Sequence, residues 1–304
     1  MESKKNTLIN YSGKRALYGV SSMISKLETV GMLKPMEALK AADPKKWHYG
    51  NSFDPAKIDN NYSSFTKILS DLNVNILWMN SKNNKIADSI FTYDASFMTP
   101  KGAILLSLGK PLRKGEEKIH EAFYKKNNIP IIGRLSGSAL AEGGDMFWVD
   151  KKTVVIGKSF RTNQQGIEQI KRMLNKLNVA VVSFDLPFFK GSEACLHMMS
   201  LISIVGYKKA LTYKPLLPIG LVQLLEKKGY KLIKAPEDEF ISSEGLNINV
   251  LAINPGECVM ICGFPKTKKA LEKNGVNVHT FDGNSLCIGC EGGPTCLTRP
   301  ILRE

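Results

Sequence analysis

The chain returns five times to the same order of segments, a strand, a second strand, an amphipathic helix and a third strand, and this repeat limits the folds open to it. The clearest unit, residues 145–184, has a helix that Thr162 or Asn163 can cap. Helices are expected at residues 58–72, 114–127, 164–177, 217–229 and 266–275. Strands are expected at residues 27–34, 74–79, 88–98, 103–109, 129–135, 145–150, 153–159, 179–184, 195–206, 208–214, 230–235, 246–256, 257–263 and 276–281.

Units of this size cannot bury their apolar faces alone, so each needs neighbours. No Ser/Gly-rich linker interrupts the series, which predicts a single α/β domain over residues 1–304. Small mixed sheets can pack radially around a central channel, as the blades of a β-propeller do. The first unit is looser, because a Pro-rich stretch follows its first strand. A closed ring would bring the loops that lead into the units together on the axis, where we expect the chemically active residues.

Positive charge is in excess, with 42 Lys and Arg against 28 Asp and Glu, a formal net charge of +14. Such an excess can indicate nucleic-acid binding. Here the lysines are scattered over expected loops and exposed helix faces and are not interleaved with aromatic residues. We therefore expect a solvated basic surface and no nucleic-acid partner, with a phosphate- or RNA-binding face as the alternative.

The sequence gives no sign of a membrane or export segment. Residues 1–15 lack the continuous apolar stretch of a secretory signal, and no later run approaches the ~20 apolar residues that span a bilayer. We expect a cytoplasmic protein with no membrane contact, whose six cysteines remain thiols.

Residues that could carry chemistry lie where the units begin. Asp88 and Asp94 bracket FTYD, residues 91–94, in an expected strand. Glu142 and Asp145 belong to EGGD. His197 begins the fourth unit, and Cys296 follows the last one. A thiol, an imidazole and several carboxylates on one axis suit covalent catalysis on a cationic, carbon-centred electrophile.

Each of these residues has a structural alternative. His197 can be a core histidine, Asp94 and Glu142 can be turn or cap residues, and Arg161 can pin a helix start. Four other cysteines have spacings compatible with structural zinc, although two of them lie in an expected buried strand: Cys258, Cys262, Cys287 and Cys290. Cys296 differs because it follows Gly292, Gly293 and Pro294, a turn that leaves access to the thiol.

Five motifs in this order resemble the guanidino-group-modifying superfamily, which includes dimethylarginine dimethylaminohydrolases, arginine deiminases and amidinotransferases. They are FTYD (91–94), EGGD (142–145), GKSFRTNQQG (157–166), LHMMS (196–200) and GGPTCLTRP (292–300). The resemblance covers nearly the whole chain and implies the five-bladed α/β propeller of that superfamily, the pentein fold.

The resemblance also implies roles. Cys296 is similar to the nucleophile, His197 to the general acid and base, and Glu142 to its carboxylate partner. Asp94 resembles the carboxylate that grips the guanidinium, with Phe91 available to stack on its plane. Further substrate contacts are implied for three residues, of which the first would hold an α-carboxylate: Arg161, Asp88 and Arg113. Neither a metal nor another cofactor is implied.

Departures from the family patterns bear on the substrate. Met198 and Met199 follow His197 where deiminases and amidinotransferases usually have Leu-Asp, and an apolar residue there favours an N-methylated guanidine. Tyr93 stands where the dimethylarginine enzymes have an acid, and GGPTC looks more like a deiminase. We expect a dimethylarginine dimethylaminohydrolase-like enzyme that releases citrulline and an amine. The alternatives are an arginine deiminase, an amidinotransferase, or an inactive basic propeller that binds RNA. A homodimer is left open.

Overall fold

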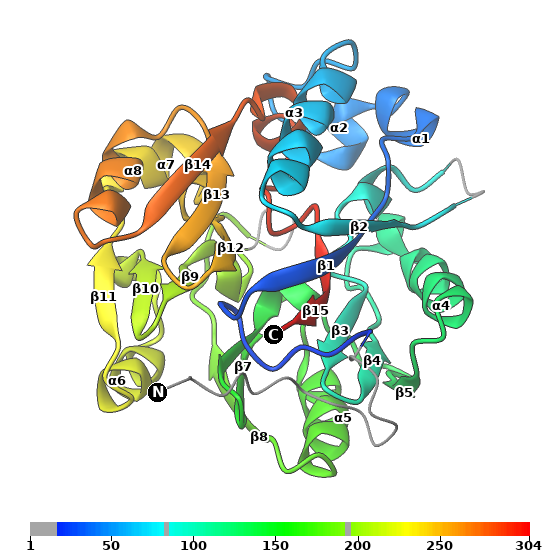
Figure 1. Ribbon diagram of the computed structural model, residues 1–304. Helices are drawn as coiled ribbons and strands as arrows, with labels where there is room; N and C mark the ends of the chain where they lie inside the picture. The colour runs from blue at the N-terminus through cyan, green and yellow to red at the C-terminus, as the bar shows by residue number, and fades with distance from the viewer. Residues whose placement is uncertain (1–16, 82–84, 192–195) are drawn as a thin grey trace, which may run out of the picture.

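Five three-stranded sheets make up the framework of the computed structural model, which describes residues 17–81, 85–191 and 196–304. In every sheet the first strand runs antiparallel to the middle strand, and the middle strand runs parallel to the third. Figure 1 shows the sheets disposed around the middle of the molecule with the longer helices toward the outside. This mixed α/β arrangement is consistent with a propeller-like fold.

The predicted order of strand, strand, helix and strand is confirmed in four of the five units. The sheets are β15-β1-β2 (Arg299–Arg303, Leu27–Met32, Asn75–Trp78), β3-β4-β5 (Ser96–Thr99, Gly102–Leu105, Ile131–Arg134), β6-β7-β8 (Met146–Asp150, Thr153–Lys158, Ala180–Asp185), β9-β10-β11 (Ile202–Gly206, Lys209–Thr212, Lys231–Lys234) and β12-β13-β14 (Leu251–Asn254, Glu257–Ile261, Asn277–Phe281). The α-helices are α1 (Glu37–Lys40), α2 (Pro44–Trp47), α3 (Ile58–Asp71), α4 (Glu116–Lys126), α5 (Gln164–Asn175), α6 (Ile219–Lys227), α7 (Glu237–Ser243) and α8 (Pro265–Glu272).

The first unit differs from its prediction, because its antiparallel strand comes from the other end of the chain. β15 pairs with β1, with Val30 opposite Pro300. The short run RPILR has two arginines and a proline, so its strand character is weak in the sequence. Both arginines are buried, and Arg303 donates from Nη2 to the Ala252 carbonyl at 2.8 Å. Cys296 therefore leads into the first sheet and does not merely follow the last one.

Helix α5 shows how the sequence pattern sets the packing. Asn163 caps it by accepting a hydrogen bond from the Gly166 N–H at 2.9 Å, a contact worth about 1 kcal/mol. Ile167, Ile170 and Leu174 lie on one face of the helix and are buried. The cap and the apolar stripe together fix the helix against its sheet.

The expectation that FTYD lies in a strand is wrong. A 3₁₀ helix spans Ala87–Ile90, and turns follow before β3 begins at Ser96. The polar groups of this segment bond to distant parts of the chain: the Tyr93 N–H donates to the Cys296 carbonyl at 3.1 Å, and the Thr92 hydroxyl contacts the Leu297 carbonyl at 3.2 Å. Tertiary hydrogen bonds thus replace the ladder that the apolar pattern suggested.

None of the described helices is both long and apolar enough to cross a bilayer.

Candidate active site

One residue lies just before the first strand of each sheet, and four of these five residues line a common cavity of about 450 Å³. Asp94 precedes β3, Glu142 precedes β6, His197 precedes β9 and Cys296 precedes β15. The fifth position, before β12, is taken by Asn249, which is not among the predicted site residues. Seven of the eight predicted site residues line the cavity: Asp88, Phe91, Asp94, Arg113, Arg161, His197 and Cys296.

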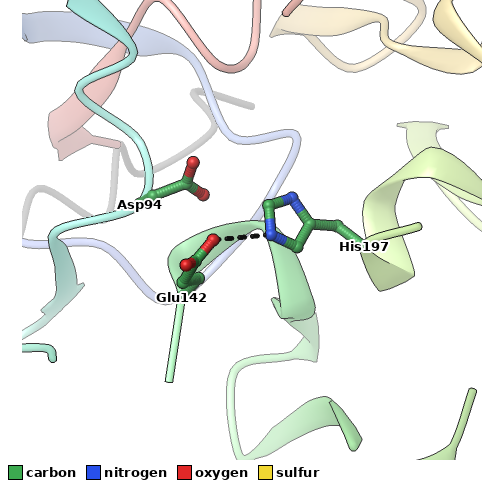
Figure 2. Close-up of side chains that lie close together, drawn as sticks. All are labelled: Asp94, Glu142 and His197. Atoms are coloured by element: carbon green, nitrogen blue, oxygen red, sulfur yellow. Dashed lines mark hydrogen bonds and ion pairs between the residues drawn. The ribbon is translucent and has the colours of Figure 1, made fainter. Parts of the chain in front are cut away.

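Glu142 is the exception, because it is completely buried directly behind the cavity wall. Its Oε2 lies 2.8 Å from His197 Nε2 and 2.6 Å from Arg161 Nη2, and its Oε1 accepts from the Gly109 N–H at 2.9 Å. Figure 2 shows the carboxylate pointing at the imidazole, with Asp94 alongside. Glu142 therefore orients His197 from behind.

Asp94 is held on both oxygens. Arg113 Nη1 approaches Oδ2 at 2.7 Å, and the Gly144 N–H donates to Oδ1 at 2.8 Å. The remaining fork of Arg113 binds Glu116, with Nε and Nη2 each 2.8 Å from a carboxylate oxygen. Arg113 thus reaches the cavity wall with most of its donors already used, and its clearest effect is to fix Asp94.

The two carboxylates beside His197, those of Asp94 and Glu142, both have a lowered pKa, which favours the ionised form. Burial by itself favours the neutral acid, but the nearby cations outweigh it. Arg113 and His197 lower the pKa of Asp94, and Arg161 together with His197 holds the pKa of Glu142 well below its usual range.

Asp94, Glu142 and His197 offer atoms within 4.8 Å of one another, a spacing that a metal could use. Each of these carboxylates already has a cationic partner, because Arg113 contacts Asp94 and Arg161 contacts Glu142.

His197 begins a 3₁₀ turn, Met198–Ser200, whose Met198 N–H donates to Asp145 Oδ1 at 2.9 Å. Burial and Arg161 lower the pKa of His197, but Asp94, Glu142 and Asp145 outweigh them, so the net pKa is raised. A Cβ at position 144 would stand 2.4 Å from the ring Nδ1. The second glycine of EGGD is therefore needed for the imidazole to sit beside Asp94.

Cys296 is only partly buried, unlike its neighbours in the sequence. Burial and the charge of Asp94 raise the pKa of its thiol to about 11, against the opposing effects of Asn249, the Gly293 N–H and Arg113. The free thiol is therefore mostly protonated at neutral pH.

Asp88 and Phe91, which also line the cavity, are held in place by their surroundings. Asp88 accepts from the Tyr49 hydroxyl at 2.7 Å and from Lys110 Nζ at 3.0 Å. A Cβ at position 292 would lie 2.3 Å from Cε1 of Phe91, so Gly292 lets this ring face the cavity.

The zinc site considered for the cysteines is not formed by the described residues. Among the described residues, Asp94, Glu142 and His197 form the single cluster with metal-ligand spacing, so the four remaining described cysteines do not gather into a zinc site.

Met199 packs in the apolar core, whereas Leu196 and Ser200, from the same segment, line the cavity. Met199 is therefore not placed to set the substrate preference through the cavity wall, contrary to the expectation from the sequence.

Comparison with protein families identifies a match over residues 45–301 to the family described as N,N dimethylarginine dimethylhydrolase, eukaryotic. The chain is 27% identical over 242 residues to the uncharacterized protein YkgA of Bacillus subtilis, covering 80% of this chain and 79% of YkgA. It is 26% identical over 286 residues to the arginine deiminase of Borreliella afzelii, covering 79% of this chain and 66% of the deiminase.

Solved structures share the fold. A mutant dimethylarginine dimethylaminohydrolase of Pseudomonas aeruginosa, complexed with citrulline, superposes with a TM-score of 0.74 at 21% identity, covering 92% of this chain and all of that one. An amidinotransferase of Microseira wollei gives a TM-score of 0.77 at 16% identity, covering 94% and 97%. The resemblance inferred from the motifs is confirmed by the family match over residues 45–301.

Proposed function

The chain belongs to the N,N-dimethylarginine dimethylhydrolase family, and on this premise we propose that it hydrolyses the guanidinium group of arginine or an N-methylated arginine to citrulline and an amine. The observation that carries the proposal is the meeting of Cys296, His197 and Asp94 at one cavity, with Glu142 behind the imidazole. We further propose that residues 1–304 form one closed five-bladed propeller and that the enzyme acts in the cytoplasm, where its thiol stays reduced.

Recognition of the substrate rests on charge and shape. An ionised carboxylate, Asp94, would accept hydrogen bonds from the guanidinium N–H groups, and Phe91 offers an aromatic face for its plane. Because Asp94 is already fixed by Arg113 and Gly144, it needs no reorganisation when the substrate binds.

The chemistry would proceed through a covalent intermediate. The cationic substrate lowers the pKa of the Cys296 thiol, and the thiol proton passes to solvent. Sγ then forms a bond to the central guanidinium carbon as the C=N π electron pair moves to nitrogen. His197 as imidazolium gives its proton to the departing amine as the C–N bond breaks, leaving a thiouronium. Neutral His197 then takes a proton from water, whose oxygen attacks the same carbon. The C–S bond breaks, the thiolate is restored, and the ureido product loses its extra proton.

The alternatives within the superfamily are an arginine deiminase and an amidinotransferase. A panel of arginine, mono- and dimethylarginine, agmatine and guanidino acids separates them when both the ureido product and the released amine are measured. A dimethylargininase releases methylamine or dimethylamine, a deiminase releases ammonia, and a transferase forms ureido product only slowly without an amine acceptor. Failure of every compound in both assays would contradict the proposal and would favour the inactive, RNA-binding alternative.

Arg161→Ala tests the proposed contact with the substrate carboxylate. Arg161 lines the cavity, and its buried Nε has no hydrogen-bond partner among the described residues. Loss of a charged hydrogen bond should lower kcat/KM for arginine about 10- to 100-fold, mainly through KM. Agmatine, which lacks the carboxylate, is the matched substrate and should lose much less. Equal kinetics of the two substrates in the wild-type enzyme would refute this role.

A further inference from the structure

The repeat itself draws attention to Asn249. Four sheets are preceded by a residue of the proposed catalytic group, and the fifth, β12-β13-β14, is preceded by Asn249. This residue lies after the 3₁₀ turn Leu246–Ile248, is 9% exposed and lines the cavity. An asparagine at this position is neither a nucleophile nor an acid or base, so its value must lie in its amide.

The orientation of that amide is fixed by the backbone. The Thr295 N–H points at one terminal atom of Asn249 at 3.0 Å, and because an N–H must meet an acceptor, this atom is the oxygen Oδ1. The other terminal atom is then the Nδ2 donor, which lies 3.0 Å from Cys296 Sγ. The same loop that carries the thiol thus aims a donor at it.

The glycine turn provides a second donor and the space for the first. The Gly293 N–H also faces the sulfur and, like the amide of Asn249, lowers the pKa of the thiol. A Cβ at position 293 would lie 2.5 Å from Cγ of Asn249. Any side chain there would push the amide away from Cys296.

We propose that Asn249 is a further catalytic residue, which together with the Gly293 N–H forms a two-donor cradle that holds Cys296 Sγ as the thiolate. The proposal rests on the proposed function, in which that thiolate is the nucleophile. The cradle also receives the sulfur again when the C–S bond breaks, so it stabilises the leaving group of the second step.

Other groups facing the sulfur cannot replace the cradle. Asp94 disfavours the thiolate, whereas Arg113 favours it. His197 shares the cavity but has its Nε2 on Glu142. The guanidinium of Arg113 bonds to Glu116 and Asp94, so the groups that act on the sulfur directly are the neutral donors of Asn249 and Gly293.

The test measures thiol reactivity separately from turnover. The rate of Cys296 alkylation by iodoacetamide is followed by mass spectrometry between about pH 7 and about pH 10, in wild type and in two variants. Asn249→Ala removes the donor and should lower the rate about tenfold at each pH, as expected for one hydrogen bond to a charged atom. Asn249→Asp keeps the acceptor for Thr295 but replaces the donor with a negative charge, so its rate should fall further. In both variants kcat should fall more than KM rises.

The chain supplies two controls. Exposed Cys262 is alkylated in the same samples and should keep its wild-type rate and pH profile. Asn274→Asp makes the same chemical change at the end of α8, where Nδ2 donates to the Ala270 carbonyl, and should leave Cys296 reactivity unchanged. Thermal unfolding confirms that each variant is folded, and Asn249→Asp serves if the alanine variant is not.

Unchanged Cys296 alkylation in a folded Asn249 variant would overturn the cradle. Its failure is distinguishable from failure of the proposed function, because alkylation requires no substrate. Wild type without ureido product, combined with slowed alkylation in the variants, would refute the hydrolase and leave the cradle standing.

Discussion

Cys296→Ser is expected to remove ureido formation, with kcat lowered by at least ~10³-fold. A serine hydroxyl is far less acidic than a thiol, so far less of it is present as the anion that attacks the guanidinium carbon. The substitution changes one atom, so the fold and substrate binding should remain. Stopped assays with citrulline detection measure the loss, and binding of unreacted substrate by calorimetry measures what is retained.

Cys290→Ser is the matched control. Cys290 also lines the cavity, but it is buried and its sulfur faces the Ser285 carbonyl at 3.9 Å. Burial and Asp88 raise its thiol pKa far above the ordinary value, so it is a poor nucleophile. Activity close to wild type is expected. Appreciable turnover by Cys296→Ser, or a comparable loss in Cys290→Ser, would contradict the choice of nucleophile.

The glycines explain why so much of the site could be predicted. Motifs such as EGGD and GGPTC combine a polar side chain with positions that tolerate no Cβ. In the structure these positions face other site residues: Gly144 meets His197 and Gly292 meets Phe91. The repeat then predicts that loops distant in sequence converge, because every unit leads into its sheet in the same way.

What was missed depends on partners that the local sequence does not encode. Asn249 in LNINV resembles any turn asparagine until Cys296 is placed beside it. FTYD has the composition of a strand, but hydrogen bonds to distant groups, among them the carbonyls of Cys296 and Leu297, hold it in turns. β15 is a strand because it pairs antiparallel with β1, which lies more than 250 residues earlier in the chain.

Glu142→Gln tests the electrostatic centre of the site and should lower kcat about 10²- to 10⁴-fold. Glu142 helps to raise the pKa of His197, so removing its charge should lower that pKa. The imidazolium would then persist only at lower pH, and the alkaline limb of the kcat profile, which follows loss of the acid, should move to lower pH. Both carboxylate oxygens of Glu142 accept hydrogen bonds, so the amide nitrogen of glutamine would face either the Gly109 N–H or Arg161, a donor facing a donor that costs stability on the order of 3 kcal/mol.

Glu257→Gln offers the same substitution in the same type of pair, because Glu257 Oε1 lies 3.1 Å from His279 Nε2 outside the cavity. It should leave kcat and its pH profile unchanged. Thermal unfolding at each pH separates loss of the folded state from loss of the acid. An unmoved alkaline limb in a folded Glu142→Gln enzyme would show that His197 is not the proton donor whose pKa Glu142 sets. The leaving amine would then have to take its proton from another group, and His197→Ala would retain the wild-type profile.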